Sequence, residues 1–168
     1  MVPRYLRLLA LSLAVCLAGC KHQPQPFSND LKMSDASAER QLTAGFHERE
    51  QEAWRWTART FAVVFVPSPV ARQSGATLRL QLLIPAQQIQ RLGPMTLSAE
   101  AGEAPLDPET FTTGGGFAYT RHVPAAAFQH AVLPVVFSFD KAVAAGRVDG
   151  RELAAVVTEV ALQPDGSL

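Results

Sequence analysis

The chain has 168 residues, of which 15 are basic and 15 acidic, and 48% of its residues are hydrophobic. This hydrophobic content is too high for a chain that is disordered throughout, and the length suits one domain that can bury a core. Lys and Arg form no run or patch along the sequence, which argues against nucleic-acid binding because phosphate neutralisation requires clustered cations.

The first twenty residues carry a targeting pattern. Arg4 and Arg7 precede an apolar run of about eleven residues from Leu8 to Ala18, and small residues lead into Cys20. The run is shorter than the roughly 18–20 residues that cross a bilayer, so the pattern predicts a secretory signal and not a transmembrane helix. An ordinary signal peptide that happens to end in Cys is the alternative.

The end of this pattern, Leu17-Ala18-Gly19-Cys20, resembles the lipobox of bacterial lipoproteins. The resemblance implies cleavage before Cys20, diacylglycerol on its thiol and acylation of the new amine, with palmitate as a typical fatty acid. Cys16 lies in the segment that would be removed, so the mature chain would have no disulfide and no free thiol. Lys21, not Asp, follows Cys20, which resembles the pattern sorted to the outer membrane. The expected location is therefore the cell envelope, lipid-anchored to the outer membrane and facing the periplasm.

The chain is expected to have three parts: a signal peptide over residues 1–19, a lipidated flexible tether over residues 20–43, and a folded domain over residues 44–168. The tether is inferred from its polar composition, its two early prolines and the lack of a sustained hydrophobic period. Within it, residues 33–42 could form a marginal helix capped by Ser34 or Asp35.

From Gly45 onward, short runs alternate between apolar and polar residues with a period of two, which is typical of half-buried β-strands. Such runs occupy residues 59–66, 78–84, 95–100, 117–123, 133–139 and 154–163. Gly and Pro separate the runs, and this pattern predicts an all-β, antiparallel β-sandwich of about seven or eight strands, either jelly-roll or immunoglobulin-like. Little helix is expected, with one turn at residues 87–92 and another at residues 125–130.

Two separated groups of residues carry a family resemblance. They are Gly45-Phe46 with Glu50 and Trp54-Arg55-Trp56-Thr57, and Asp149-Gly150-Arg151-Glu152-Leu153. Together they resemble a family of bacterial β-sandwich domains that occur alone as small lipoproteins and, in related form, appended to glycosyltransferase-like proteins. The resemblance implies an accessory or interaction role with no established activity, and it places Arg151 opposite the Glu50–Trp56 region. Ala154 departs from the family pattern, which has Gly there.

The sequence offers little catalytic chemistry. The mature chain would have no free Cys, and its serines lie in no Gly-x-Ser-x-Gly elbow. A metal-ligand pair of His47 and Glu50 is conceivable, but a solvated loop is the simpler interpretation. Asp107-Pro108-Glu109 is interpreted as a turn. We therefore expect a protein that is not an enzyme and that uses no metal or cofactor.

Trp54 and Trp56 are two residues apart, so on an extended strand they point to the same face, opposite Arg55. They are either a stacking platform for sugar rings or large core residues, and aromatic residues of a small sandwich are more often core. Trp56 leads directly into an apolar strand, and we predict that it is core.

Arg151 lies in a turn just before the last strand. We predict that its guanidinium forms a buried ion pair with a carboxylate, Glu50 being the first choice, Asp149 the second and Glu48 the third. Its stem is expected to lie on an indole face.

The candidate binding or structural cluster is thus Glu50, Trp54, Trp56, Asp149 and Arg151. The expected function is that of a non-enzymatic envelope lipoprotein whose sandwich mediates interaction with an envelope protein, and the alternative is a carbohydrate-binding module for envelope glycans. A solvent-exposed aromatic patch would favour a glycan, whereas buried tryptophans and an exposed apolar strand edge would favour a protein partner.

Overall fold

The computed structural model describes residues 26–146 and 149–166, so the predicted signal peptide and Cys20 lie outside the described residues. Nine β-strands form within these two ranges. They are β1 (Asp30–Lys32), β2 (Leu42–Glu50), β3 (Trp54–Phe65), β4 (Ala76–Ile84), β5 (Met95–Ala101), β6 (Ala104–Phe111), β7 (Gly115–Val123), β8 (Leu133–Phe139) and β9 (Val156–Pro164). All pairings between them are antiparallel. The predicted all-β antiparallel fold is confirmed, with β1, β2 and β6 as strands that the sequence pattern did not reveal.

Helices are few and short. They are α1 (Pro69–Ser74), α2 (Ala86–Leu92) and the 3₁₀ turns η2 (Ala36–Gln41) and η3 (Ala125–Ala127). The sequence predicted a marginal helix at the position of η2 and turns at those of α2 and η3, whereas α1 was missed because Pro67 and Pro69 were taken as breakers. Ser68 caps α1 by accepting a hydrogen bond from Ala71 N, and Pro69 occupies the first turn, where a missing N–H costs nothing. No helix in the described part of the chain is long and apolar enough to cross a membrane.

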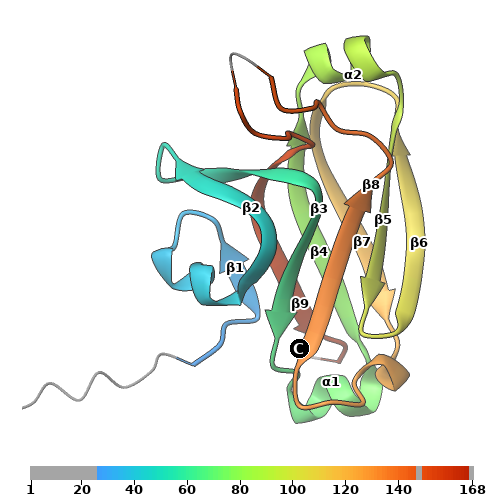
Figure 1. The fold of residues 1–168 in the computed structure, drawn as a ribbon. Helices are drawn as coiled ribbons and strands as arrows, with labels where there is room; N and C mark the ends of the chain where they lie inside the picture. The colour runs from blue at the N-terminus through green and yellow to red at the C-terminus, as the bar shows by residue number, and fades with distance from the viewer. Residues whose placement is uncertain (1–25, 147–148, 167–168) are drawn as a thin grey trace, which may run out of the picture.

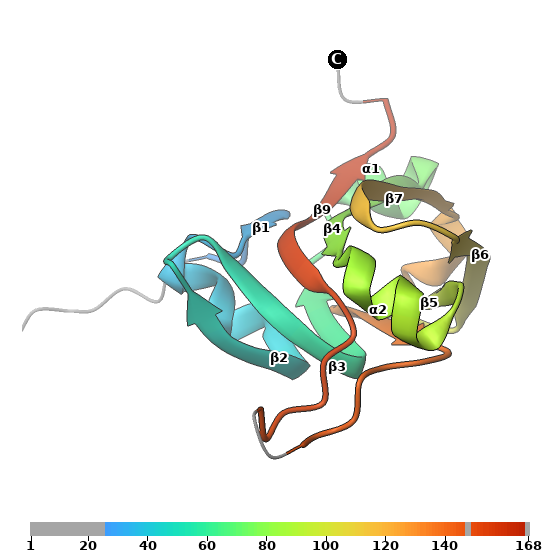
Figure 2. The same ribbon diagram turned by 90° about the horizontal axis from the view of Figure 1, so that it is seen from above.

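The strands follow one another in the order β6-β5-β8-β3-β9-β4-β7, with β1 added to β9 and β2 added to β3. The long strand β3 bridges two halves of this order. Its residues 60–65 pair with β8, and Arg55 and Trp56 pair with β9. Viewed from above, the strands wrap around a common interior, which makes the sandwich nearly a barrel (Figures 1 and 2).

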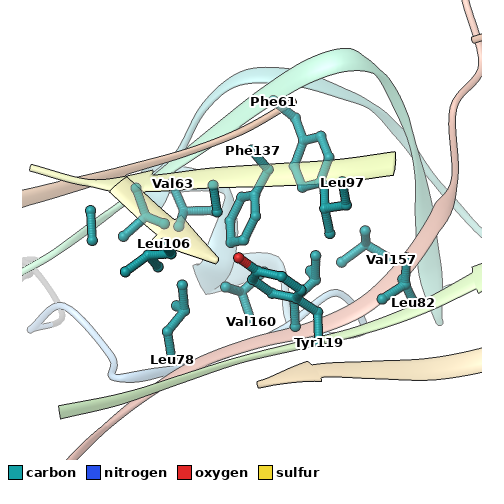
Figure 3. Packing of buried hydrophobic residues seen from close by; sticks show 14 of the residues in the cluster. Phe61, Val63, Leu78, Leu82, Leu97, Leu106, Tyr119, Phe137, Val157 and Val160 are labelled. Carbon is teal, nitrogen blue, oxygen red and sulfur yellow. The ribbon is translucent and has the colours of Figure 1, made fainter. Parts of the chain in front are cut away.

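Alternating side chains from both halves fill this interior. Phe61 of β3 stacks on Phe137 of β8 with ring centroids 5.0 Å apart, and Tyr119 of β7 meets Phe137 edge-on at 6.4 Å. Figure 3 shows these rings packed with Leu97, Val160 and other aliphatic side chains. Each fully buried side chain of this kind contributes about 1.5–3 kcal/mol, so the core by itself can hold the domain together.

Side chains close the seam between β6 and β7, the two ends of the strand order. The Tyr119 hydroxyl donates to the carbonyl of Asp107 at 2.9 Å. The Arg121 guanidinium lies 4.2 Å above the Tyr119 ring and donates to the carbonyls of Asp107 and Pro108 and to the carboxylate of Glu109, at 2.7, 3.1 and 3.0 Å.

The turn predicted at residues 107–109 is therefore wrong, since these residues lie inside β6. The ladder between β5 and β6 shifts register between Leu97 and Ala99, which leaves Asp107 and Pro108 as a bulge opposite Ser98. A bulge tolerates Pro because no ladder hydrogen bond is required there.

The folded domain begins before the predicted boundary at residue 44. Leu31, Met33 and Ala38 are at most 3% exposed, and β1 pairs with β9. Residues 28–43 are thus part of the domain and not a flexible tether. The pattern was missed because three isolated apolar residues show neither a helical nor a strand period, yet each inserts into the shared core. The predicted helix at residues 33–42 is present as η2, with Asp35 as its N-cap.

Candidate functional site

The two tryptophans lie on the outer face of β3. Arg55 and Thr57 point inward and are 6% and 0% exposed, whereas Trp54 and Trp56 are half-buried on the opposite side of the strand. The prediction that Trp56 belongs to the core is therefore wrong. The phase of β3 is set by Phe61, Val63 and Phe65, whose inward positions direct the even-numbered residues outward.

Neighbouring strands extend this outer surface. Trp56 pairs with Val156 of β9, and Val156 pairs in turn with Leu83 of β4. Residues opposite one another in an antiparallel ladder share a face, so an apolar row crosses three strands, although Val156 at its centre is only 9% exposed. Leu83 is 43% exposed at the end of this row. We call Trp54, Trp56, Val156 and Leu83 the indole face.

An ion-pair cluster borders the indole face. Glu50 of β2 lies opposite Trp54 in the ladder, and its Oε1 accepts a hydrogen bond from Arg151 Nη1 at 2.8 Å. Arg151 also donates hydrogen bonds from Nε and Nη2 to the Asp149 carboxylate, at 2.9 and 2.8 Å. Both predicted partners of Arg151 are present at once, but the three side chains are 34–36% exposed, so the cluster is half-buried and not buried as predicted.

Arg151 and Asp149 stabilise each other's charged forms. Hydrogen bonds from the Arg151 side chain and backbone hold the pKa of Asp149 at about 2, below its ordinary value of 3.8. The same carboxylate and Glu50 raise the pKa of Arg151 further above its usual range. A carboxylate with a pKa this low is a weak general base near neutral pH, so the cluster suits positioning and polar recognition.

The hairpin between β2 and β3 presents the two groups together. Its turn places Gln51 and Glu52 in the left-handed region, with φ of 47° and 52°. That conformation costs roughly 1–2 kcal/mol for a residue other than Gly. Glu50 and Trp54 flank this strained turn, so the tip of the hairpin sets their mutual placement (Figure 1).

The segment that carries Arg151 is tied to the sandwich from three sides. His47 Nε2 of β2 donates to the carbonyl of Glu152 at 2.7 Å, and Arg59 N of β3 donates to the Glu152 carboxylate at 2.8 Å. Gln88 Nε2 of α2 donates to the carbonyl of Leu153 at 3.0 Å. His47 and Glu50 thus have separate partners and do not form a ligand pair. The described ranges contain no group of three or more His, Cys, Asp or Glu side chains that could hold a metal ion.

Sequence reasoning missed the role of Arg55, which it used only to define the side opposite the tryptophans. The Arg55 side chain is 7% exposed, and Nη2 lies 2.5 Å from Glu39 Oε1 of η2. Its Nη1 donates to the carbonyl of His47 at 3.0 Å. Arg55 thereby fastens η2 and β2 to β3. The cation–π pair in the described part of the chain is that of Arg121 over Tyr119, and Arg151 forms none with either indole there.

Comparisons with known proteins give structural likenesses only. No protein-family model and no curated protein matches the sequence. Among the solved structures that resemble the backbone are three carbohydrate-binding modules. A carbohydrate-binding module of family 36 in complex with calcium and xylotriose has 8% identity and a TM-score of 0.44, covering 80% of this chain and 98% of that one. A domain of the same family from a multidomain xylanase of the Trinervitermes trinervoides hindgut metagenome has 8% identity and a TM-score of 0.46, covering 82% and 97%. A family 35 carbohydrate-binding module from Clostridium thermocellum has 12% identity and a TM-score of 0.45, covering 80% and 97%. With TM-scores below 0.5, these likenesses assign neither a family nor a ligand to this chain.

Proposed function

We propose that this protein is a non-enzymatic glycan-binding module of the cell envelope, anchored by lipid on Cys20 to the outer membrane and facing the periplasm. The observation that carries the proposal is the outward position of Trp54 and Trp56 beside the Glu50–Arg151–Asp149 cluster. The anchor is inferred from the lipobox pattern at Leu17 to Cys20.

The chemistry of the indole face suits a sugar ring. A half-buried indole is rigid and offers a flat apolar surface, and it loses little conformational entropy when it stacks against the C–H groups of a pyranose. Polar side chains at the edge of such a surface fix the orientation of the ligand through its hydroxyl groups. Glu50 stands directly opposite Trp54 in the ladder, and Arg151 holds it in place.

A protein partner that pairs with a strand edge is less well supported. The described edge strand β6 contains Pro105 and Pro108, and β2 carries the charged run from His47 to Glu50 with repeated register shifts. Prolines, charges and bulges are the features by which edge strands avoid pairing with another chain. These two edge strands thus lack the exposed apolar surface that an edge-pairing protein partner would use.

The test exploits the composition of the chain, because its two tryptophans both lie on the indole face and intrinsic fluorescence reports on that face alone. The lipidated protein in detergent micelles is titrated with envelope polysaccharides and their oligosaccharides. We expect binding to shift the emission. Trp54→Ala and Trp56→Ala should each weaken affinity about tenfold, as expected for the loss of about 1.4 kcal/mol of stacking, and binding is then followed by calorimetry.

Phe27→Ala is the matched control, because Phe27 is a 40% exposed aromatic residue outside the indole face. It should bind glycan as the wild type does. The proposal fails if the wild type binds no glycan of the set, or if each tryptophan variant loses affinity only in proportion to the fraction that is unfolded in a urea melt.

A further inference from the structure

Exposed hydrophobic side chains gather at one end of the domain. Six large hydrophobic residues of the described chain are at least 40% exposed: Phe27, Val66, Val70, Leu83, Val132 and Val136. Single exposed hydrophobic residues are ordinary, whereas a contiguous group marks an interaction surface. Four of the six, which we call the apolar end, lie on the segments that follow β3, that lead into β8 or that enter the domain beside the last residues of β3. They are Phe27, Val66, Val70 and Val132.

Hydrogen bonds place Phe27 at this end. Its neighbour Ser28 donates its backbone N–H to Gln41 Oε1 at 2.7 Å, and Gln41 Nε2 donates to the carbonyl of Val64 at 2.9 Å. The described chain therefore enters the domain beside the last residues of β3. Figure 1 shows this entry, in blue, next to the end of the β3 arrow.

The three valines are connected by the ladder and by α1. Phe65 pairs with Leu133, so Val66 and Val132 follow directly outward from the last pair of β3 and β8. Val70 lies in the first turn of α1. Arg72 of the same helix donates to the carbonyls of Phe128, His130 and Ala131 at 2.8, 2.8 and 3.1 Å, which holds α1 against the segment that leads into Val132.

The apolar end carries almost no charge. Residues 64–74 and 124–134, which build it, contain Arg72 as their single charged residue and no carboxylate. The opposite end of β3 is charge-rich, with Glu50, Asp149 and Arg151 beside the hairpin. Carboxylates of other segments lie beside the apolar end: Glu103 lines a pocket with Val132, and Asp165 accepts a hydrogen bond from Ser74 through its carbonyl. The apolar side chains themselves come from segments without a carboxylate, so their insertion among lipid headgroups requires no burial of an unpaired carboxylate from those segments.

We infer that the apolar end docks on the lipid surface that holds the anchor. The inference rests on the proposed acylation of Cys20. Phe27 follows Cys20 by seven positions in the sequence, and seven Cα-to-Cα steps span at most about 23–25 Å when fully extended. The point at which the chain enters the domain is thus held close to the bilayer, and the neutral apolar side chains around that point can insert at the headgroup level. Docking in this way directs the indole face, at the start of β3, away from the membrane.

The test places an environment-sensitive dye at single cysteines of the lipidated protein in phospholipid vesicles. Acylated Cys20 does not react with the dye and Cys16 is removed with the signal peptide, so the introduced thiol is labelled alone. Val66→Cys and Val132→Cys report on the apolar end. Leu83→Cys is the matched control, since Leu83 is an equally exposed hydrophobic residue on the indole face.

We expect the emission of the dye at positions 66 and 132 to shift to shorter wavelength and to be quenched by brominated lipids, while the dye at position 83 keeps its aqueous spectrum. Val70→Glu should reverse the shift at position 66 while the protein remains in the vesicle pellet. An acylated protein whose dye at positions 66 and 132 stays in water overturns the inference and leaves the proposed function intact. A protein that mass spectrometry finds without acyl groups overturns both the inference and the proposed anchor.

A second copy of this chain is the competing occupant of the apolar end. The same labelled positions are therefore examined without vesicles in an unacylated form that starts at Lys21 and lacks both native cysteines. A blue shift there that grows with protein concentration indicates a dimer interface and overturns the membrane assignment. An aqueous spectrum at all concentrations, together with the shift in vesicles, supports it.

Discussion

At the residue scale, Arg151 is the side chain that joins two parts of the chain at the candidate site. Its guanidinium bridges Glu50 of the hairpin and Asp149 of its own turn, and its backbone N–H also donates to Asp149 at 3.0 Å. One side chain therefore fixes the turn before β9 and the position of the carboxylate that faces Trp54.

The stability contribution of this cluster should be intermediate. Exposed ion pairs contribute about 0–1 kcal/mol, and removing one member of a buried pair costs about 3–5 kcal/mol. Because the Arg151 side chain is 34% exposed, we expect Arg151→Ala to lower the free energy of unfolding by about 1–2 kcal/mol in urea melts. The double variant Arg151→Ala with Glu50→Ala should lose less unfolding free energy than the two single variants lose in sum.

Arg59→Ala provides a control for this prediction, since Arg59 is exposed on β3 and bonds the same segment through its backbone N–H. The free energy of unfolding of this variant should stay within about 0.5 kcal/mol of the wild-type value. Additive losses for Arg151 and Glu50 would show that the bridge between them contributes nothing.

At the scale of the element, the short strand β1 decides where the domain begins. Three residues pair with β9, and the central one, Leu31, is 1% exposed. Met33 then donates its backbone N–H to the carbonyl of Thr158 at 2.9 Å, which continues the contact past the strand. A strand this short is stable because it adds to an existing sheet and buries its middle side chain in the common core.

Leu31→Ala should lower the free energy of unfolding by about 2–5 kcal/mol, the range observed for a buried Leu that is cut back to Ala. Limited proteolysis of the wild type should give a stable fragment that starts before Ser28 and retains β1, because ordered backbone resists cleavage. Lys32→Ala, at an exposed position of the same strand, should change neither result. Early cleavage between residues 28 and 43 of the wild type would contradict this placement of the boundary.

At the scale of the whole molecule, the sandwich is nearly closed, and the closure depends on side chains. β6 and β7 are the two ends of the strand order, and Tyr119 and Arg121 of β7 reach across to the bulge of β6. The bulge turns the carbonyls of Asp107 and Pro108 toward β7, where Arg121 satisfies both.

Arg121→Ala should therefore open the seam. We expect the free energy of unfolding to fall by about 1–3 kcal/mol, the usual penalty for leaving hydrogen-bond partners unpaired. Amide hydrogen exchange in β6 should become faster. Arg79→Ala is the control, because Arg79 also forms an ion pair, with Glu159, but its side chain is 42% exposed and it spans no seam. Arg79→Ala should lower the free energy of unfolding by no more than about 1 kcal/mol. Equal losses for the two variants would indicate that the seam is closed by the core alone.

The sequence by itself determined the all-β antiparallel class, the main strands and their buried rows. A strand with alternating apolar and polar residues has one arrangement that hides its apolar side chains, so β4, β5 and β8 could be located from their own residues. The partners of Arg151 were also predictable, since Glu50 and Asp149 are carboxylates within the two groups of residues that carry the family resemblance.

Tertiary structure alone decided the features that depend on residues distant in sequence. Trp56 lies outside the core because β3 is apolar on both sides, so its own residues do not define a phase, and contacts with Phe137 and the rest of the interior select the odd-numbered face. Leu31 and Met33 belong to the core because β9 supplies a free edge for β1. The apolar end exists because the ladder and Arg72 bring together residues about 60 positions apart in the chain. In each case the deciding contacts are long-range, and a local hydrophobic period carries no information about them.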